Sequence, residues 1–493
     1  MNEIISESRE IIFMDERERT LQRQRAYRKR RRRLIHRIKL ISLLVLFLAV
    51  IGTGVGIYSH WVEVEKANAE AELLAQKQAR ITSVQKKIDT YFSEFIKTTS
   101  LETVSSKEQS FGTWLWERCF VKLSESDLEK TLNALENQDI QENILRQYTG
   151  ESMHVLTDRY LGRITFENQI YERTGKNKSE AEITIAGDLC FAEDGFVLDH
   201  YDTVKDLSKC ISPHLLETMN QTDIFYINHE YCISDRGAPL NGKYYTFRAK
   251  PERMELLKQM GTDLVALANN HVFDYGKDAL IDTTKLLQQA NIPYVGGGVN
   301  IEEAKRPVYF IVNGMKIGFV GASNAEKLRY TPQATEDTPG ILRAYDTTEY
   351  NAVIQEASKN CDYLIAYIHW GTEDSNYLNS LQQSMGREFL NSGADIVVGG
   401  HPHVLQGMEY VDGKPIVYSL GDFWFNSETK YTGLLKLRID FDGLKEMAFV
   451  PALQTNYTTQ YIEATEKQRK LFDFLEELSI NIKIDDNGII TQK

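Results

Sequence analysis

The chain has 493 residues and a formal net charge of −13, from 57 Lys and Arg residues against 70 Asp and Glu residues. Hydrophobic residues make up 42% and charged residues 26%, which is typical of globular proteins and excludes collagen-like, rod-like and wholly disordered chains. Residues 1–39 carry +7, so the rest of the chain carries −20, and a body this acidic argues against general nucleic-acid binding.

The first predicted element is a membrane-spanning helix at residues 40–58. These 19 residues carry no charge, and a helix of that length reaches roughly 28 Å, close to the thickness of the bilayer's hydrocarbon core. A basic run at 28–39 precedes the segment, and Tyr58 and Trp61 lie at its far edge, where aromatic rings settle at the interface. The positive-inside rule therefore places residues 1–39 in the cytoplasm and the remainder outside. A cleaved signal peptide is the alternative, which the length and depth of the apolar run disfavour.

Residues 59–178 are predicted to form a helical stalk and membrane-proximal region. Positions 63–98 are rich in Ala, Glu, Lys and Gln with scattered apolar residues, which is typical of a charged helix. A further helical pattern follows Ser124, a residue type that caps helix N-termini. Nothing in this region indicates chemistry.

From residue 179 to about 455, short apolar runs alternate with amphipathic helical patterns. This alternation predicts an α/β domain with buried sheets. The predicted strands lie at 182–186, 224–227, 264–268, 309–312, 317–320, 363–368, 396–398 and 415–420. The predicted helices lie near 251–260, 277–290, 349–358 and 378–392. Residues 456–493 are predicted to form a C-terminal helix and tail.

Polar residues collect where the predicted strands end, which is the edge at which α/β sheets bind ligands. The runs are GD at 187–188, NHE at 228–230, NNHVFDYG at 269–276, HWGTE at 369–373, GGHPH at 399–403 and GD at 421–422. Asp, Glu, Asn and His side chains together form an N/O ligand set that suits Mn²⁺, Zn²⁺ or Fe and suits soft-metal chemistry poorly. The sequence therefore predicts a divalent-metal site of unknown metal identity.

Each run taken alone also has a structural explanation. A Gly-Asp pair after a strand usually forms a turn, Asn-Asn-His side chains bond loop backbone, and a single histidine such as His369 is more often a core residue. The segment from His401 to His403 is more specific. Imidazoles at positions i and i+2 of an extended segment project to the same side and converge on one metal pair. The combination, rather than any single run, indicates the site.

These motifs resemble those of the CapA/PgsA family of poly-γ-glutamate capsule synthesis proteins, which is related to the calcineurin-like metallophosphoesterases. The resemblance covers roughly residues 181–455 and rests on GDLCFAEDG, NHE, LANNHVFDYG, HWGTE, GGHPHVLQGME and SLGDFWF. It implies a two-sheet αββα sandwich of metallophosphoesterase type, preceded by a transmembrane helix and the helical membrane-proximal region. It also implies a bacterial cell-membrane location, single-pass, with the domain outside the cell.

The resemblance implies roles for individual residues. The implied metal ligands are Asp188, Glu230, Asn270, His369, His401 and His403. His271 is the implied acid that protonates the leaving group, and Asp274 is expected to orient its ring. The residues expected at the substrate are Asn228, His229, Glu373 and Asp422. The histidine of the superfamily's D-x-H motif is replaced by Cys190, which implies that one metal is weakly held or absent.

Three functions remain open from the sequence. The first is an extracytoplasmic metal-dependent hydrolase or transferase in surface-polymer synthesis or export, acting on a phosphoester or a γ-glutamyl amide. The second is a non-catalytic accessory subunit that binds an anionic polymer and guides it for a membrane synthase. The third is a signalling module in which residues 63–175 sense and the α/β domain only binds. The expected partners are the membrane, a synthase or export complex, and an anionic polymer or phosphoester.

Overall fold

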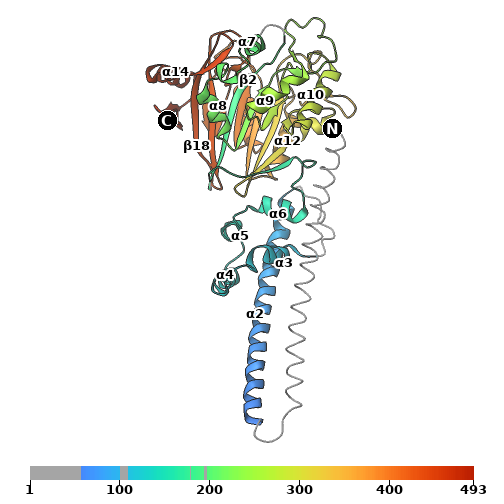
Figure 1. The fold of residues 1–493 in the computed structure, drawn as a ribbon, viewed down its shortest axis with the longest axis vertical. Helices are drawn as coiled ribbons and strands as arrows, with labels where there is room; N and C mark the ends of the chain where they lie inside the picture. Colours follow the sequence, from blue (N-terminus) through green and yellow to red (C-terminus); the bar gives the residue numbers. More distant parts are fainter. Residues whose placement is uncertain (1–56, 100–108, 178, 194–196) are drawn as a thin grey trace. The chain divides into compact units, whose positions relative to one another are not determined.

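The computed structural model describes residues 57–99, 109–177, 179–193 and 197–493 (Figure 1). The predicted membrane span at 40–58 lies outside this part of the chain except for its last two residues. Among the residues that are described, no helix combines the length and apolar character needed to cross a bilayer. The described chain divides into two units, one formed by residues 57–87 and 124–138 and the other by residues 88–123 and 139–493.

The smaller unit contains the first part of α2 (Ile57–Thr98) and α4 (Glu125–Asn137). The predicted cap is confirmed, because the Ser124 side chain accepts a hydrogen bond from the first turn of α4. Arg80 on α2 donates to Glu136 Oε2 on α4 at 2.8 Å. The Arg80 side chain is 31% exposed, so this ion pair contributes no more than about 1 kcal/mol.

The larger unit contains two mixed sheets. One has the strand order β1 (Ile170–Arg173), β9 (Val308–Val312), β10 (Met315–Ser323), β12 (Tyr363–His369), β13 (Ile396–Gly400), β15 (Lys414–Val417) and β14 (Met408–Val411). The other has the order β19 (Thr458–Tyr461), β18 (Gly443–Thr455), β17 (Lys430–Asp440), β2 (Ala181–Leu189), β3 (Ile224–His229), β6 (Leu264–Ala266) and β7 (Tyr294–Val295), with β16 (Asp422–Trp424) also beside β2. All eight predicted strands are confirmed.

The two sheets pack against each other, and helices cover their outer faces. Tyr226 on β3 meets Phe319 on β10 and Tyr367 on β12, with ring centroids 5.5 and 5.8 Å apart. The covering helices are α8 (Pro213–Asn220), α9 (Met254–Gln259) and α10 (Lys277–Gln289) on the β2 sheet, and α12 (Thr348–Ser358) and α13 (Ser380–Asn391) on the other. The predicted helices are therefore confirmed, and the layers follow the predicted α–β–β–α order.

Two segments differ from what the sequence indicates. Residues 170–173, in a stretch with a helical pattern, form β1 and pair in parallel with β9. The C-terminal segment forms α14 (Thr465–Leu478) and the hairpin of β20 (Ile482–Ile484) and β21 (Ile490–Gln492). Its apolar side chains belong to the core cluster between the sheets, namely Leu471, Phe472, Leu475, Ile482, Ile484 and Ile490. The amphipathic pattern identifies the helix but not the surface on which its apolar face is buried.

A buried ion pair joins α6 (Met153–Leu161) to β10. Lys316 Nζ lies 2.6 Å from Asp158 Oδ2, and each side chain is 2% exposed. Removing one partner leaves a buried charge unpaired, which costs about 3–5 kcal/mol, although Arg163 lies 3.4 Å from the same carboxyl group and offsets part of that cost. We expect Lys316→Met to lower the free energy of unfolding by about 3 kcal/mol in urea denaturation. The double variant Lys316→Met/Asp158→Leu should recover most of the loss, and a single variant as stable as the parent would contradict the expectation.

Candidate metal centre

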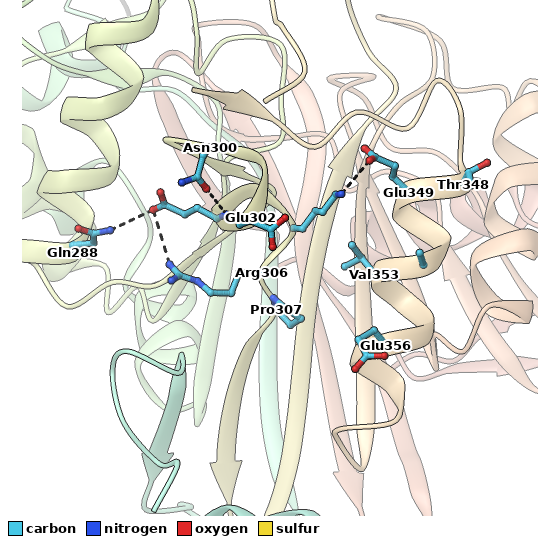
Figure 2. A pocket seen from close by; sticks show the side chains of 12 residues that line it. Gln288, Asn300, Glu302, Arg306, Pro307, Thr348, Glu349, Val353 and Glu356 are labelled. Carbon is cyan, nitrogen blue, oxygen red and sulfur yellow. Dashed lines mark hydrogen bonds and ion pairs between the residues drawn. The ribbon is translucent and has the colours of Figure 1, made fainter. Parts of the chain in front are cut away.

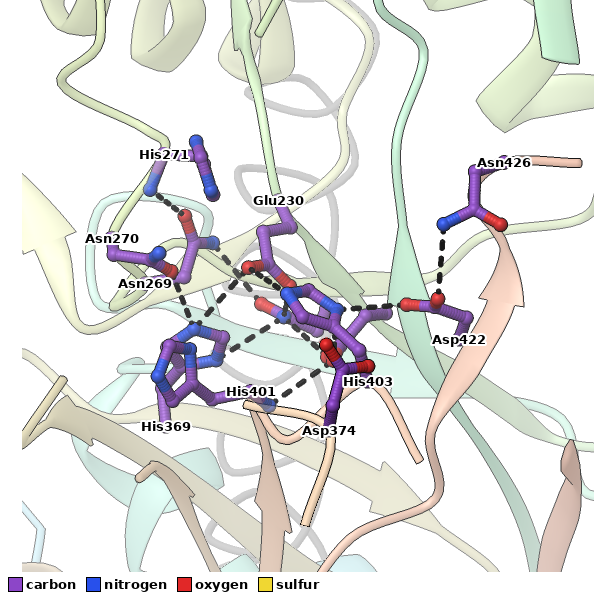
Figure 3. Close-up of polar contacts among 12 residues, drawn as sticks. Glu230, Asn269, Asn270, His271, His369, Asp374, His401, His403, Asp422 and Asn426 are labelled. Atoms are coloured by element: carbon purple, nitrogen blue, oxygen red, sulfur yellow. Dashed lines mark hydrogen bonds and ion pairs between the residues drawn. The ribbon is translucent and has the colours of Figure 1, made fainter. Parts of the chain in front are cut away.

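Side chains from the ends of five strands in both sheets form two neighbouring donor groups (Figure 3). The first donor group is Glu230, His369 and His401, and the second donor group is Asp188, His403 and Asp422. In each group, one ligand-type atom per residue lies within 4.8 Å of the others. A further set joins the exposed Glu373 to His401 and His403. The parallel strands therefore bring together distant residues at one edge, as the sequence predicts for a metal site.

Asn228 holds the carboxylates of the two groups in place. Its Nδ2 donates to Asp188 Oδ1 at 2.7 Å and to Glu230 Oε2 at 3.0 Å. Its Oδ1 in turn accepts from Asn269 Nδ2 at 3.1 Å. Asn228 is 1% exposed and its side chain positions the ligand groups, while its contact with substrate stays a prediction. Asn269 was not singled out from the sequence, although it lies inside the NNH run.

Asn270 and His369 meet beside the first donor group. His369 Nε2 lies 2.7 Å from Asn270 Oδ1 and 3.4 Å from Glu230 Oε1. Burial lowers the pKa of His369 well below its ordinary value, so the ring is neutral, which is the state that binds metals. Both side chains are therefore placed where the resemblance implies ligands, and their ligand roles stay a prediction.

The His401–His403 segment is not extended, so our expectation for its geometry is wrong. His401 has φ +97° and His403 has φ +58°, a region that non-glycine residues rarely adopt. The turn is held by Asp188, whose Oδ2 accepts the backbone N–H of His401 at 3.1 Å. His401 belongs to the first donor group and His403 to the second, with ring centroids 6.0 Å apart, and ligand atoms of both rings also meet in the set with Glu373.

Asp422 is a member of the second donor group rather than a peripheral residue. Its Oδ1 lies 2.8 Å from His403 Nδ1, and its side chain is fully buried. On its other side, Asn426 Nδ2 donates to Asp422 Oδ2 at 3.4 Å, and Lys430 Nζ lies 3.6 Å from the same oxygen. These contacts correct our placement of Asp422 at the substrate, because both of its carboxylate oxygens are already used inside the cluster.

His271 and Asp274 form a buried pair beside the donor groups. His271 Nδ1 lies 2.6 Å from Asp274 Oδ2, and the same oxygen accepts the backbone N–H of Phe247 at 2.7 Å. Lys243 Nζ lies 2.6 Å from Asp274 Oδ1 and also donates to the carbonyl oxygen of Asn270. Burial lowers the pKa of His271 to about 4, against the opposing effect of Asp274. Lys243 was missed from the sequence because its Gly- and Tyr-rich loop carries no motif.

His229 does not reach the cluster, and our prediction that it contacts substrate is wrong. Successive side chains of a strand point to opposite faces, so Asn228 faces the donor groups and His229 faces away. The His229 ring is fully buried and stacks on Tyr231 at 3.8 Å between centroids. Burial lowers its pKa to about 3.

The residues of the cluster fit a divalent cation. Asp188, Glu230 and Asp422 have no exposed surface, and buried carboxylates are costly without a compensating positive charge. Burial raises the pKa of Glu230 to about 8. The pKa of Asp188 is raised well above its ordinary value by burial and by the neighbouring Glu230 carboxyl group. Within the described residues, Glu230 Oε1 and His401 Nδ1 are buried with no hydrogen-bond partner. These orphaned ligand atoms and the N/O donor chemistry are what a divalent metal requires.

Metal uptake should depend on pH with a definite sign. Below about pH 8 the Glu230 carboxyl group of the metal-free protein holds a proton that a cation must displace. We therefore expect the affinity for Mn²⁺ or Zn²⁺ to fall as the pH is lowered below 8. Each displaced proton lowers the affinity by up to about tenfold per pH unit. Titrations at pH 6.5, 7.5 and 8.5 measure this slope, which Glu230→Gln should reduce. A pH-independent affinity in the parent protein would contradict the expectation.

Cys190 belongs to neither donor group. It is fully buried in the apolar cluster beneath the outer helices. Burial raises the pKa of its thiol well above the ordinary value, and the nearby Glu230 carboxylate adds to the shift. The histidine of the D-x-H motif therefore has no counterpart in the donor groups of the described residues.

A cavity of about 920 Å³ lies away from the cluster, between α10, α11 (Ile301–Lys305) and α12 (Figure 2). Its charged groups mostly neutralise one another, with Lys305 Nζ 3.0 Å from Glu349 and Arg306 3.9 Å from Glu303. None of the predicted site residues lines it. The chemistry is therefore assigned to the donor groups and not to this larger space.

Two solved structures resemble the fold only weakly. The 5'-nucleotidase from Candida albicans SC5314 aligns with 15% identity and a TM-score of 0.31 over 55% of this chain and 54% of that one. The protein TT1561 of Thermus thermophilus aligns with 10% identity and a TM-score of 0.31 over 55% of this chain and 98% of that one. Similarity at this level carries no conclusion about function.

Curated proteins are more similar in sequence. The PGA biosynthesis protein CapA of Bacillus subtilis is 34% identical over 204 residues, 41% of this chain and 53% of that protein. The capsule biosynthesis protein CapA of Bacillus anthracis is 32% identical over 232 residues, 45% of this chain and 55% of that protein. A probable polyglutamine synthesis accessory protein of Mycobacterium tuberculosis is 28% identical over 209 residues, 41% of this chain and 55% of that protein. The chain spans about half the length of the curated relatives it matches.

The family model described as "Bacterial capsule synthesis protein PGA_cap" matches residues 166–427. This range is more than half of the chain and contains every residue of both donor groups, together with His271 and Asp274. The chain therefore belongs to the bacterial capsule synthesis protein family PGA_cap.

Proposed function

We propose that the α/β domain is a metal-dependent hydrolase that acts in the synthesis or export of a poly-glutamate surface polymer. The observation that carries the proposal is the pair of donor groups, in which Glu230 Oε1 and His401 Nδ1 are buried without a hydrogen-bond partner. The names of the relatives, which refer to capsule, PGA and polyglutamine synthesis, support the pathway. The bond cleaved would be a γ-glutamyl amide or a phosphoester.

The proposed roles follow from the contacts. The two donor groups would hold the cation, with Asn270 beside the first of them. A divalent cation at this place would polarise the scissile group and lower the pKa of water. His271 would protonate the leaving group from its imidazolium form, which the 2.6 Å contact of Nδ1 to Asp274 favours against the effect of burial. Asn228 keeps Asp188 and Glu230 at their positions during turnover.

We also propose that residues 40–58 anchor the protein in the bacterial cell membrane, with the domain outside. The uncharged 19-residue run and the +7 charge of residues 1–39 support this topology. Reporter fusions after residue 39 and after residue 493 test it. An externally active enzyme fused at the C-terminus should work, and the same enzyme fused after residue 39 should not.

The hydrolase proposal is tested on the purified full chain. Elemental analysis should find a stoichiometric transition metal, and γ-glutamyl peptides or phosphoesters should be hydrolysed. Chelation should abolish turnover, and adding back the metal should restore it. Bound metal with no turnover on either substrate class would reject the hydrolase and leave the accessory function.

A second candidate is the non-catalytic accessory subunit that guides an anionic polymer. The observation that favours it is Cys190, which stands in the place of a metal-binding histidine and lies outside both donor groups. In this case an Asp188→Ala/His401→Ala variant would still support polymer export by cells that carry it. Loss of export in that variant, with normal protein levels, would favour the hydrolase.

A further inference from the structure

Arg343 is a buried cation with no carboxylate at ion-pair distance among the residues that the structure describes. The side chain is 5% exposed. Its Nη2 donates to the carbonyl oxygen of Glu326 at 2.6 Å and its Nη1 to that of Thr331 at 3.4 Å, while Nε has no hydrogen-bond partner. The Tyr345 ring lies 4.2 Å from the guanidinium, and the nearby Glu326 carboxylate compensates part of the charge without forming an ion pair. A buried charge that is only partly compensated is costly, so its retention points to a function.

The position of Arg343 places this charge next to the metal centre. Ser323, at the end of β10, forms a parallel backbone β-bridge with Arg343 on one side and is in register with His369 of β12 on the other. Residues in register on neighbouring strands point to the same face of a sheet, so Arg343 and His369 share a face. The link continues through Thr331, whose hydroxyl donates to the carbonyl oxygen of Asn270 at 3.0 Å.

A smaller cavity lies between two loops, one containing Arg329 and Tyr330 and the other containing residues 240–242. It has a volume of about 350 Å³ and is lined by Leu240, Asn241, Gly242, Arg329 and Tyr330. The Tyr330 hydroxyl donates to the carbonyl oxygen of Gly242 and so joins the two loops. The next residues in each loop are Lys243 and Thr331, which both contact the carbonyl oxygen of Asn270. The cavity is therefore adjacent to the metal centre.

Arg329 is the charged residue in the lining of this cavity. Its Nη2 donates to the Tyr330 hydroxyl at 2.7 Å, and its guanidinium lies over the Tyr330 ring at 4.5 Å. In the described part of the chain no carboxylate oxygen pairs with it. Two arginines without a carboxylate at ion-pair distance therefore occur between β10 and α12, beside the centre of a domain whose overall charge is strongly negative.

We propose that the 350 Å³ cavity is the subsite for a carboxylate group of the substrate, with Arg329 as the contacting residue and Arg343 as the positive charge behind it. This inference rests on the proposed function and deepens it, since it names a polycarboxylate rather than a phosphoester as the substrate class. The guanidinium fork matches a carboxylate with two parallel hydrogen bonds. The volume lies at the lower end of ligand pockets, which run from roughly 300 to 1,000 Å³.

Calorimetric binding to the full chain tests the proposal with γ-linked triglutamate and the same peptide with its carboxylates amidated. We expect the free acid to bind at least about tenfold more tightly than the amide, as the loss of a charged hydrogen bond implies. Arg329→Gln and Arg343→Met should each weaken triglutamate binding about tenfold and leave binding of the amide unchanged. Lys327→Gln is the matched control, because Lys327 is an exposed cation on the same loop, and its effect should stay within about twofold.

Three outcomes overturn the proposal. The first is that the free acid and the amidated peptide bind with equal affinity. The second is that Arg329→Gln and Lys327→Gln change the triglutamate affinity equally. The third is that inorganic phosphate displaces triglutamate more strongly than glutarate does. Arg329 is exposed, so Arg329→Gln decides the matter if Arg343→Met fails to fold. Triglutamate binding to Asp188→Ala/His401→Ala separates the two proposals. Arginine-dependent binding that persists without hydrolysis would retain the subsite and reject only the hydrolase.

Discussion

Replacing His403 with alanine is expected to remove most of the metal from the purified protein. His403 belongs to the second donor group and also to the set with Glu373 and His401, so its loss removes a ligand atom from two sets. Loss of an outer-sphere partner alone weakens metal binding by about 10–100-fold, and loss of a direct ligand should cost at least as much. Elemental analysis after dialysis measures the bound metal, and turnover should fall in parallel.

His214→Ala is a suitable control for this experiment. His214 is exposed on α8 and stacks on Tyr461 at 3.9 Å, and it belongs to no donor group. The control variant should retain its full metal content. Unchanged metal stoichiometry in His403→Ala would show that the cluster does not hold the metal.

The second large effect is expected from His271→Ala, which should lower turnover by about 10²–10⁴-fold while the metal content stays unchanged. His271 lies in neither donor group, and its contact to Asp274 is 2.6 Å. Asp274 is held by Lys243 Nζ and by the backbone N–H of Phe247. The carboxylate is therefore rigid and fixes the ring, so the loss is one of proton transfer and not of metal binding.

Asp274→Asn separates orientation from proton donation. The amide retains the size of the carboxylate but cannot fix the ring tautomer in the same way, so we expect a smaller loss of turnover than in His271→Ala. Steady-state kinetics on whichever substrate class is hydrolysed measures both variants. A metal-loaded His271→Ala protein with full activity would exclude His271 as the general acid.

The sequence predicts the strands well because each buried strand appears as an apolar run, and each run ends in the polar residues that define the site. This pattern alone therefore places Asp188, Glu230, His369 and His401 together. The error at His229 was avoidable, since alternation along β3 already directs it away from the face of Asn228.

Other features could not be predicted from the sequence because they depend on loop contacts over long distances along the chain. Lys243 reaches Asp274 across 31 positions, and Arg343 reaches Glu326 across 17. Neither contact has a periodicity or motif. The positive φ of His401 and His403 could not be predicted for a different reason, because the turn is held by Asp188, which lies more than 200 residues earlier.

The pairing of β2 with β17 has a consequence for how the protein is made. Ile183 on β2 pairs with Leu437 on β17, about 250 residues later, and α14 and the β20–β21 hairpin complete the same core cluster. The ribosome must therefore synthesise nearly all of the domain before the sheet around β2 closes, and such non-local pairing folds slowly. The topology thus keeps the sheet around β2 incomplete until nearly the whole domain has been synthesised.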